Sequence, residues 1–162
     1  MTTIQIPIDL TLPTDGNAFW LPVALTAYIQ APWQFVKDVN GKIEGKVRIP
    51  TNMAGTPNAK IKLVIAANAT SGVTRLSVLH LAVRTKATAE SLNPAALTAI
   101  ASQDITVPGT AYNALEATFT VTETLDAEDE LIVRIYHEGA HANDTLAVNT
   151  LLFDAFLEID VT

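Results

Sequence analysis

The sequence predicts an all-β protein, a single antiparallel β-sandwich of jelly-roll type with about nine strands and an irregular N-terminal arm. Apolar and polar residues alternate strictly in several segments, and these segments lack the apolar residues three and four positions apart that a helix requires. Turn-forming residues separate the segments at short intervals. With 162 residues, 49% of them hydrophobic and 17% charged, the whole chain fits one domain with a substantial core.

The expected strands follow from the alternation, because a period of two places one set of side chains in the core and the other in water. An alternating segment runs from Ile4 to Leu12. The other expected strands are Trp33–Val39, Lys42–Ile49, Lys60–Ala67, Val73–Thr85, Ala101–Val107, Ala114–Thr122, Leu131–Tyr136 and Leu151–Val161. Asn40-Gly41 is the strongest turn signal, since both central positions of a type I′ turn need positive φ, and it predicts a hairpin between the strands on either side.

The first 32 residues are less regular than the rest. Pro13, Gly16, Pro22 and Pro32 interrupt the pattern among many apolar residues. We therefore expect residues 1–32 to form an arm that packs on the sandwich or on a neighbouring subunit. Residues 33–162 are expected to form the sandwich body.

The composition excludes several classes of function. The net charge is −7, the pI is about 4.8, and no cluster of Lys and Arg offers a nucleic-acid surface. The absence of cysteine excludes disulfides, thiolate zinc sites and cysteine catalysis. We expect no signal peptide, no membrane span and synthesis in the cytoplasm, because no segment has the required basic start or apolar length.

A polar loop after the strand Leu131–Tyr136 carries His137-Glu138-Gly139-Ala140-His141, which matches the zinc-protease pattern H-E-x-x-H. In those enzymes the motif lies on a helix, where residues four apart share one face. Here it follows a strand, which places His137 and Glu138 on opposite faces, and we interpret the match as a coincidence. The expectation is a protein without enzymatic activity, catalytic residues or cofactor. A loop metal site formed by His137, His141 and Asp144 is the alternative.

Two strands have apolar side chains on both faces. One surrounds His80, and the other, the final strand, places Leu152 and Phe156 on its nominally outer side. Spare apolar area of this kind indicates contact with a second chain, so we expect a homo-oligomer, most simply a trimer, with His80, Leu152 and Phe156 among its contacts.

Three aromatic residues near the N-terminus have two interpretations. Trp20, Tyr28 and Trp33 could form a platform on which sugars stack, as in carbohydrate-binding modules. They could equally be core or subunit contacts, because Trp and Tyr are enriched at interfaces. The second interpretation is preferred here, with Trp20 and Tyr28 as subunit or capsid contacts.

Three stretches carry a family resemblance. They are Ala31–Phe35 followed by Val47–Pro50, Ile61–Val64 leading to Ala67–Arg75, and Asp144–Ala147 followed by Leu151–Ile159. Together they resemble small β-sandwich structural proteins from the virions of tailed bacteriophages, of the capsid-decoration or fibre-tip type.

The resemblance implies a function without catalysis. The first hypothesis is a trimeric capsid decoration protein, located on the virion, that stabilises the shell through contacts with the major capsid protein. The alternative is a module of a tail fibre or appendage that binds a carbohydrate or a host receptor. Neither hypothesis involves nucleic acid or a membrane.

Overall fold

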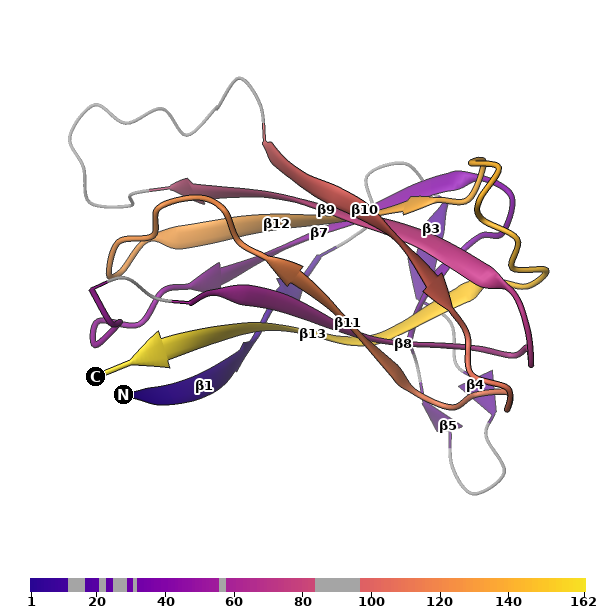
Figure 1. Ribbon diagram of the computed structural model, residues 1–162, viewed down its shortest axis with the longest axis horizontal. Coiled ribbons are helices and arrows are strands. Elements are labelled where there is room, and N and C mark those ends of the chain that lie inside the picture. The colour runs from indigo at the N-terminus through magenta and orange to yellow at the C-terminus, as the bar shows by residue number, and fades with distance from the viewer. Residues whose placement is uncertain (12–16, 21–22, 25–28, 31, 56–57, 84–96) are drawn as a thin grey trace.

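The computed structural model describes residues 1–11, 17–20, 23–24, 29–30, 32–55, 58–83 and 97–162. Two antiparallel sheets pack face to face, which confirms the predicted all-β sandwich (Figure 1). The strands are β1 Thr2–Pro7, β2 Asp9–Leu10, β3 Ala18–Trp20, β4 Val23–Ala24, β5 Ile29–Gln30, β6 Trp33–Phe35, β7 Asn40–Arg48, β8 Lys60–Ala67, β9 Val73–Val83, β10 Thr98–Thr106, β11 Leu115–Thr120, β12 Glu130–Glu138 and β13 Thr150–Val161. In the described part of the chain, no helix is long and apolar enough to cross a membrane.

The strand order shows how the chain builds the two layers. One sheet has the order β11-β8-β13-β6-β3, with β1 also paired to β13, and the other has the order β10-β9-β12-β7-β2. The short strands β4 and β5 pair with each other outside both sheets. From β6 to β13 consecutive strands lie in opposite sheets, except for the pair β9 and β10.

The core lies between the sheets and follows the alternation that predicts the strands. Along β12, Leu131, Val133 and Ile135 are fully buried, and the residues between them are partly exposed. The same pattern holds in β7, where Ile43 and Val47 face the core. Burying each such side chain contributes about 2 kcal/mol, so the core provides the main stabilisation of the sandwich.

The predicted hairpin at Asn40-Gly41 is wrong. Asn40 and Gly41 lie within β7, and the chain turns earlier, around Asp38, whose φ is 60°. The strands on either side belong to different sheets, so this connection crosses the sandwich. Gly41 is needed for close packing, because a Cβ there would lie 3.0 Å from the backbone oxygen of Asn17.

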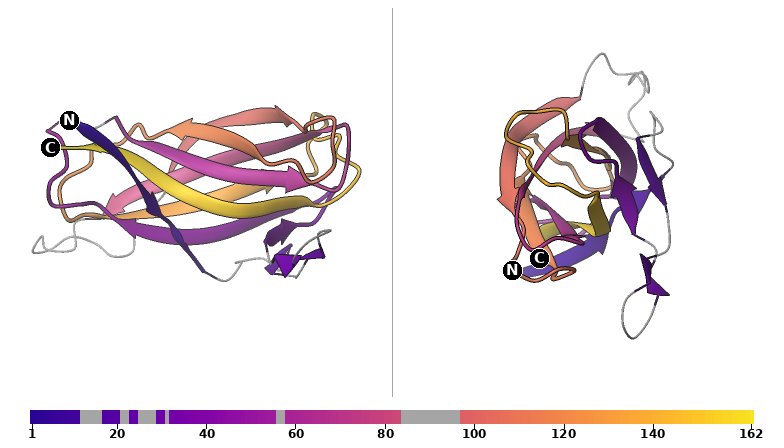
Figure 2. Two further views of the ribbon diagram at one scale, coloured as in Figure 1. Left: turned by 90° about the horizontal axis from the view of Figure 1, so that it is seen from below. Right: turned by 90° about the vertical axis from the view of Figure 1, so that its right-hand side faces the viewer.

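Residues 2–10 of the expected N-terminal arm pack on the sandwich of their own chain, as strands of its two sheets. β1 pairs with β13 over six residue pairs, from Thr2 opposite Val161 to Pro7 opposite Phe156. The buried Ile8 then carries the chain across to β2, which pairs with β7 in the other sheet. Figure 2 shows β1 alongside β13, with both termini at one end of the molecule. The first strand is therefore part of the sandwich.

A bulge in β13 changes the expected side of Leu152. The pairing with β8 shifts between Leu152 and Asp154, so Leu152 shares the inner face with Ala155 and Leu157. Its side chain is 0% exposed. The predicted subunit contact at Leu152 is wrong, because the residue belongs to the core of its own chain.

Deletion of residues 1–8 should destabilise the protein, because it removes the six pairs with β13 and the apolar side chains of Ile4, Ile6 and Ile8. We expect the free energy of unfolding in urea to fall by about 4 kcal/mol. Thr3→Ala and Gln5→Ala are matched controls on exposed side chains of the same strand, with expected changes within about 0.5 kcal/mol. An unchanged unfolding midpoint after the deletion would support a detachable arm.

Candidate functional site

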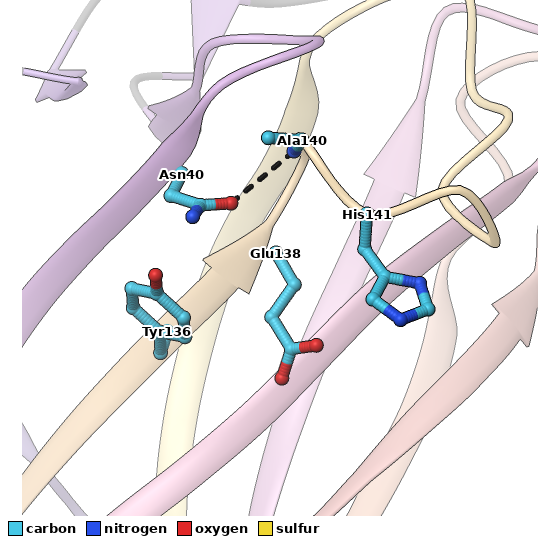
Figure 3. A pocket seen from close by; sticks show the side chains of 5 residues that line it. All are labelled: Asn40, Tyr136, Glu138, Ala140 and His141. Carbon is cyan, nitrogen blue, oxygen red and sulfur yellow. Dashed lines mark hydrogen bonds between the residues drawn. The ribbon is translucent and has the colours of Figure 1, made fainter.

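A pocket of about 270 Å³ lies where β12 ends and the loop 139–149 begins. It is lined by Asn40 from β7, Tyr136 and Glu138 from β12, and Ala140 and His141 from the loop (Figure 3). In Figure 3 the Glu138 carboxylate lies between the rings of Tyr136 and His141. Tyr136 and Glu138 share the outer face of the sheet because they are two residues apart on one strand.

The H-E-x-x-H motif lies at this place, but in strand geometry. β12 continues to Glu138, so His137 points into the sandwich and is 1% exposed, whereas Glu138 points outward. This confirms the predicted opposite orientation of the two side chains, which a zinc-protease centre does not allow.

Of the three residues in the alternative loop metal site, His137 and Asp144 lie within hydrogen-bond distance of each other. The Nε2 atom of His137 lies 3.0 Å from a carboxylate oxygen of Asp144. His141 is exposed, and its Nδ1 accepts a hydrogen bond from the backbone of Asn143 at 3.1 Å. Among the residues that the structure describes, no three His, Cys, Asp or Glu side chains converge as metal ligands.

The His137–Asp144 pair is a buried structural contact beneath the pocket. The Asp144 side chain is 2% exposed and also accepts a hydrogen bond of 2.8 Å from the backbone N–H of Arg75. Burial lowers the pKa of His137 from its ordinary value, and the nearby Asp144 carboxylate offsets this only in part. The imidazole is therefore neutral at pH 7 and donates to the Asp144 carboxylate.

A second network of hydrogen bonds and ion pairs holds the Glu138 carboxylate on the outer face of the sheet. One carboxylate oxygen accepts from Nε of Arg75 at 2.7 Å, and the other accepts from the hydroxyl of Ser102. Arg75 also forms an ion pair with Asp104, which accepts from the side chain of Asn143 at 2.7 Å. The network thus connects β9, β10, β12 and the loop.

The charges of this network are fixed by their partners. Burial raises the pKa of Glu138, but hydrogen bonds from Ser102, Arg75 and Ser77 outweigh it and leave the pKa below its ordinary value. The hydrogen bond from Arg75 likewise lowers the pKa of Asp104. Both carboxylates are therefore ionised at neutral pH.

The loop that forms one wall is attached to the sheet at several points. Asn40 accepts a hydrogen bond of 3.2 Å from the backbone of Ala140. The backbone N–H groups of Thr145 and Leu146 both donate to the carbonyl of Val73, at 2.9 and 3.0 Å. A wall fixed in this way costs little conformational entropy on ligand binding.

The residues predicted as subunit or capsid contacts lie at separate places in the structure. His80 is 0% exposed inside the sandwich, with Nδ1 3.2 Å from Glu123, so its predicted role as a subunit contact is wrong. Phe156 is partly exposed on the outer face of β13, and Trp20 is 59% exposed on β3. Tyr28 lies outside the described residues. The roles of Phe156, Trp20 and Tyr28 as contacts stay predictions.

Three of the five lining residues, Glu138, Ala140 and His141, belong to the H-E-x-x-H segment that stands out in the sequence. The sequence does not indicate the roles of Tyr136, Asn40 and Arg75. One signal was present, because Tyr136 and Glu138 occupy the outward phase of a strand whose inward phase is strongly apolar.

The fold is shared with solved structures of carbohydrate-binding modules and of an adhesin domain. A family 35 carbohydrate-binding module from Paenibacillus barcinonensis has a TM-score of 0.52 at 17% identity, over 100% of this chain and 98% of that chain. A module of Cellvibrio mixtus lichenase 5A, solved with cellotriose, has a TM-score of 0.51 at 13% identity, over 98% and 97%. The K1 cleaved adhesin domain of Lys-gingipain from Porphyromonas gingivalis has a TM-score of 0.52 at 12% identity, over 100% and 99%.

These likenesses show a common jelly-roll sandwich. No protein-family model and no curated protein sequence matches the chain.

Asp144→Ala should lower the free energy of unfolding by about 3 kcal/mol, because it leaves the His137 ring and the Arg75 amide without their buried acceptor. Urea unfolding measures the change. Asp9→Ala is the control, since Asp9 is an exposed aspartate on β2, and we expect a change within about 0.5 kcal/mol. Equal effects of the two substitutions would contradict the structural role of Asp144.

His137 should make stability depend on pH below its ordinary pKa of 6.5. Because the folded pKa is lowered, the unfolded chain takes up the proton first, so stability is full above this value and falls as the pH drops below it. The urea midpoint measured at intervals from pH 7.5 to 5.5 should fall. Glu138 and Asp104, whose folded pKa values are lowered, contribute stability that is lost only at more acidic pH.

The control for this pH dependence is a matched pair of histidine variants. His137→Gln should flatten the fall in midpoint, whereas His141→Gln, at an exposed position, should leave it unchanged. A wild-type midpoint that is constant over this range would contradict the lowered pKa of His137.

Proposed function

We propose that this protein is a carbohydrate-binding module without catalytic activity, and that a neutral sugar occupies the pocket beside Tyr136 and Glu138. The observation that carries the proposal is the lining of this pocket: an aromatic ring next to a fixed carboxylate, an amide and an imidazole. Sugars present apolar C–H faces and many hydroxyl groups. An aromatic ring complements the C–H faces, and planar polar side chains complement the hydroxyl groups.

The role of each residue follows from its place in the pocket. Glu138, ionised and held by Arg75 and Ser102, accepts hydrogen bonds from sugar hydroxyls. Asn40 offers amide N–H donors, and Tyr136 offers its ring and its hydroxyl. The fold similarity to carbohydrate-binding modules supports the same class of ligand.

The proposal is tested with a glycan array followed by titration calorimetry on the glycans that bind. Tyr136→Ala and Glu138→Gln should each weaken binding about tenfold or more, because each removes a buried contact with the ligand. Ile132→Ala is the control, since Ile132 lies on the same face of β12 but outside the pocket. An array without hits, or pocket variants with unchanged affinity, would reject the proposal.

The virion role inferred from the sequence resemblance stays a prediction. Two of its supporting residues, His80 and Leu152, are buried in the core of the chain and are not available to a second subunit. The setting that fits both the resemblance and the pocket is a tail fibre or appendage that binds a host glycan. Electron microscopy of labelled phage particles would locate the chain, and label on the capsid shell would favour the decoration role.

A further inference from the structure

Two tryptophans, the only ones in the chain, lie opposite each other at the edge of a sheet. Trp20 on β3 is the register partner of Trp33 on β6, and β3 is the last strand in its sheet. Residues directly opposite each other in an antiparallel pair point to the same face, with Cβ atoms about 5 Å apart. The two indoles therefore share one face of this edge.

Their exposure differs. Trp33 is partly buried and packs against the core, whereas Trp20 is 59% exposed. Among the described residues, Met1, Trp20 and Val39 are the large hydrophobic side chains that are exposed. Trp33 thus anchors the edge, and Trp20 presents an indole surface to solvent. An indole exposed in this way is available to stack on the apolar face of a ligand.

The size of this surface limits what covers it. A stable protein interface buries about 800 Å² on each partner, whereas one tryptophan contributes at most about 250 Å². Met1 does not extend the surface, because the N-terminus lies at the opposite end of the sandwich from β3 (Figure 1). The exposed indole of Trp20 is by itself smaller than such an interface, and its flat apolar face is of a kind that stacks on one sugar ring.

The tryptophan pair lies near the pocket. Asn17, which precedes β3, donates from its side chain to the carbonyl of Asn40 at 2.8 Å, and Asn40 lines the pocket. An extended chain covers about 10 Å between Asn17 and Trp20. A carbohydrate longer than one sugar has a second place to bind at this end of the molecule.

We propose that the Trp20–Trp33 pair is a second carbohydrate subsite, at which the apolar face of a sugar ring stacks on the exposed Trp20 indole beside the partly buried Trp33. This proposal rests on the proposed function, because it assigns the same class of ligand. It differs in its residues, which belong to another sheet from Tyr136 and Glu138.

The test uses tryptophan fluorescence, because every tryptophan of the chain belongs to this pair. In a Trp33→Phe variant, all tryptophan emission comes from Trp20. Titration with cellotriose, and with the glycan that gives the strongest array signal, should shift this emission to shorter wavelength as the indole leaves water. In the wild-type background, Trp20→Ala should weaken calorimetric binding about tenfold, and Trp20→Phe should restore most of it.

The outcomes separate the two proposals. Unchanged Trp20 emission and unchanged affinity in Trp20→Ala, with binding still lost in Tyr136→Ala, would overturn the second subsite and leave the pocket in place. Binding lost in Trp20→Ala but retained in Tyr136→Ala would support the tryptophan subsite and overturn the pocket. A lower oligomer mass in Trp20→Ala, measured by light scattering, would overturn the sugar contact in favour of a subunit contact. Absence of any glycan binding would overturn both.

Discussion

The pocket depends on one buried interaction, the hydrogen bond between His137 and Asp144. It joins the inner face of β12 to the loop that supplies Ala140 and His141, and the same carboxylate holds the backbone of Arg75 on β9. Burying a carboxylate is costly unless its hydrogen bonds are satisfied, and here two donors satisfy it. Because the loop is anchored from below in this way, Asn143 and His141 stay beside the sheet, where they can meet the network around Glu138.

The alternation of a β-strand connects this anchor to the lining of the pocket. His137 and Glu138 are neighbours in sequence, yet one belongs to the core and the other lines the pocket. Gly139 then allows the chain to leave the strand tightly, because a Cβ at this position would overlap the backbone oxygen of Val39. Strand geometry and packing thus explain the different roles of His137, Glu138 and Gly139 within the H-E-x-x-H segment.

The strands could be predicted from the sequence, but their partners could not. The alternation in β7, β12 and β13 depends on which side chains are buried, and each strand carries that information itself. The hairpin predicted at Asn40-Gly41 is wrong because a local turn signal does not reveal that the chain crosses between the two sheets. The prediction that Leu152 lies on the outer face is wrong because a bulge in β13 shifts the face of this residue. Such a bulge is not visible in the apolar pattern of the sequence. Arg75 could not be predicted as a site residue for a similar reason, since only the pairing of β9, β10 and β12 places it next to Glu138.

The shared position of Arg75 leaves a local negative charge beside the pocket, which is the reason that the proposed ligand is neutral. Its guanidinium pairs with both Glu138 and Asp104, so two negative charges face one positive charge. Because both carboxylates have lowered pKa values, this imbalance persists at neutral pH and in moderately acidic solution. An acidic sugar would meet a net negative surface within a few ångströms, and the net charge of −7 on the whole chain adds to the repulsion. A neutral sugar, the proposed ligand, would avoid this cost and would still donate hydroxyl hydrogen bonds to Glu138.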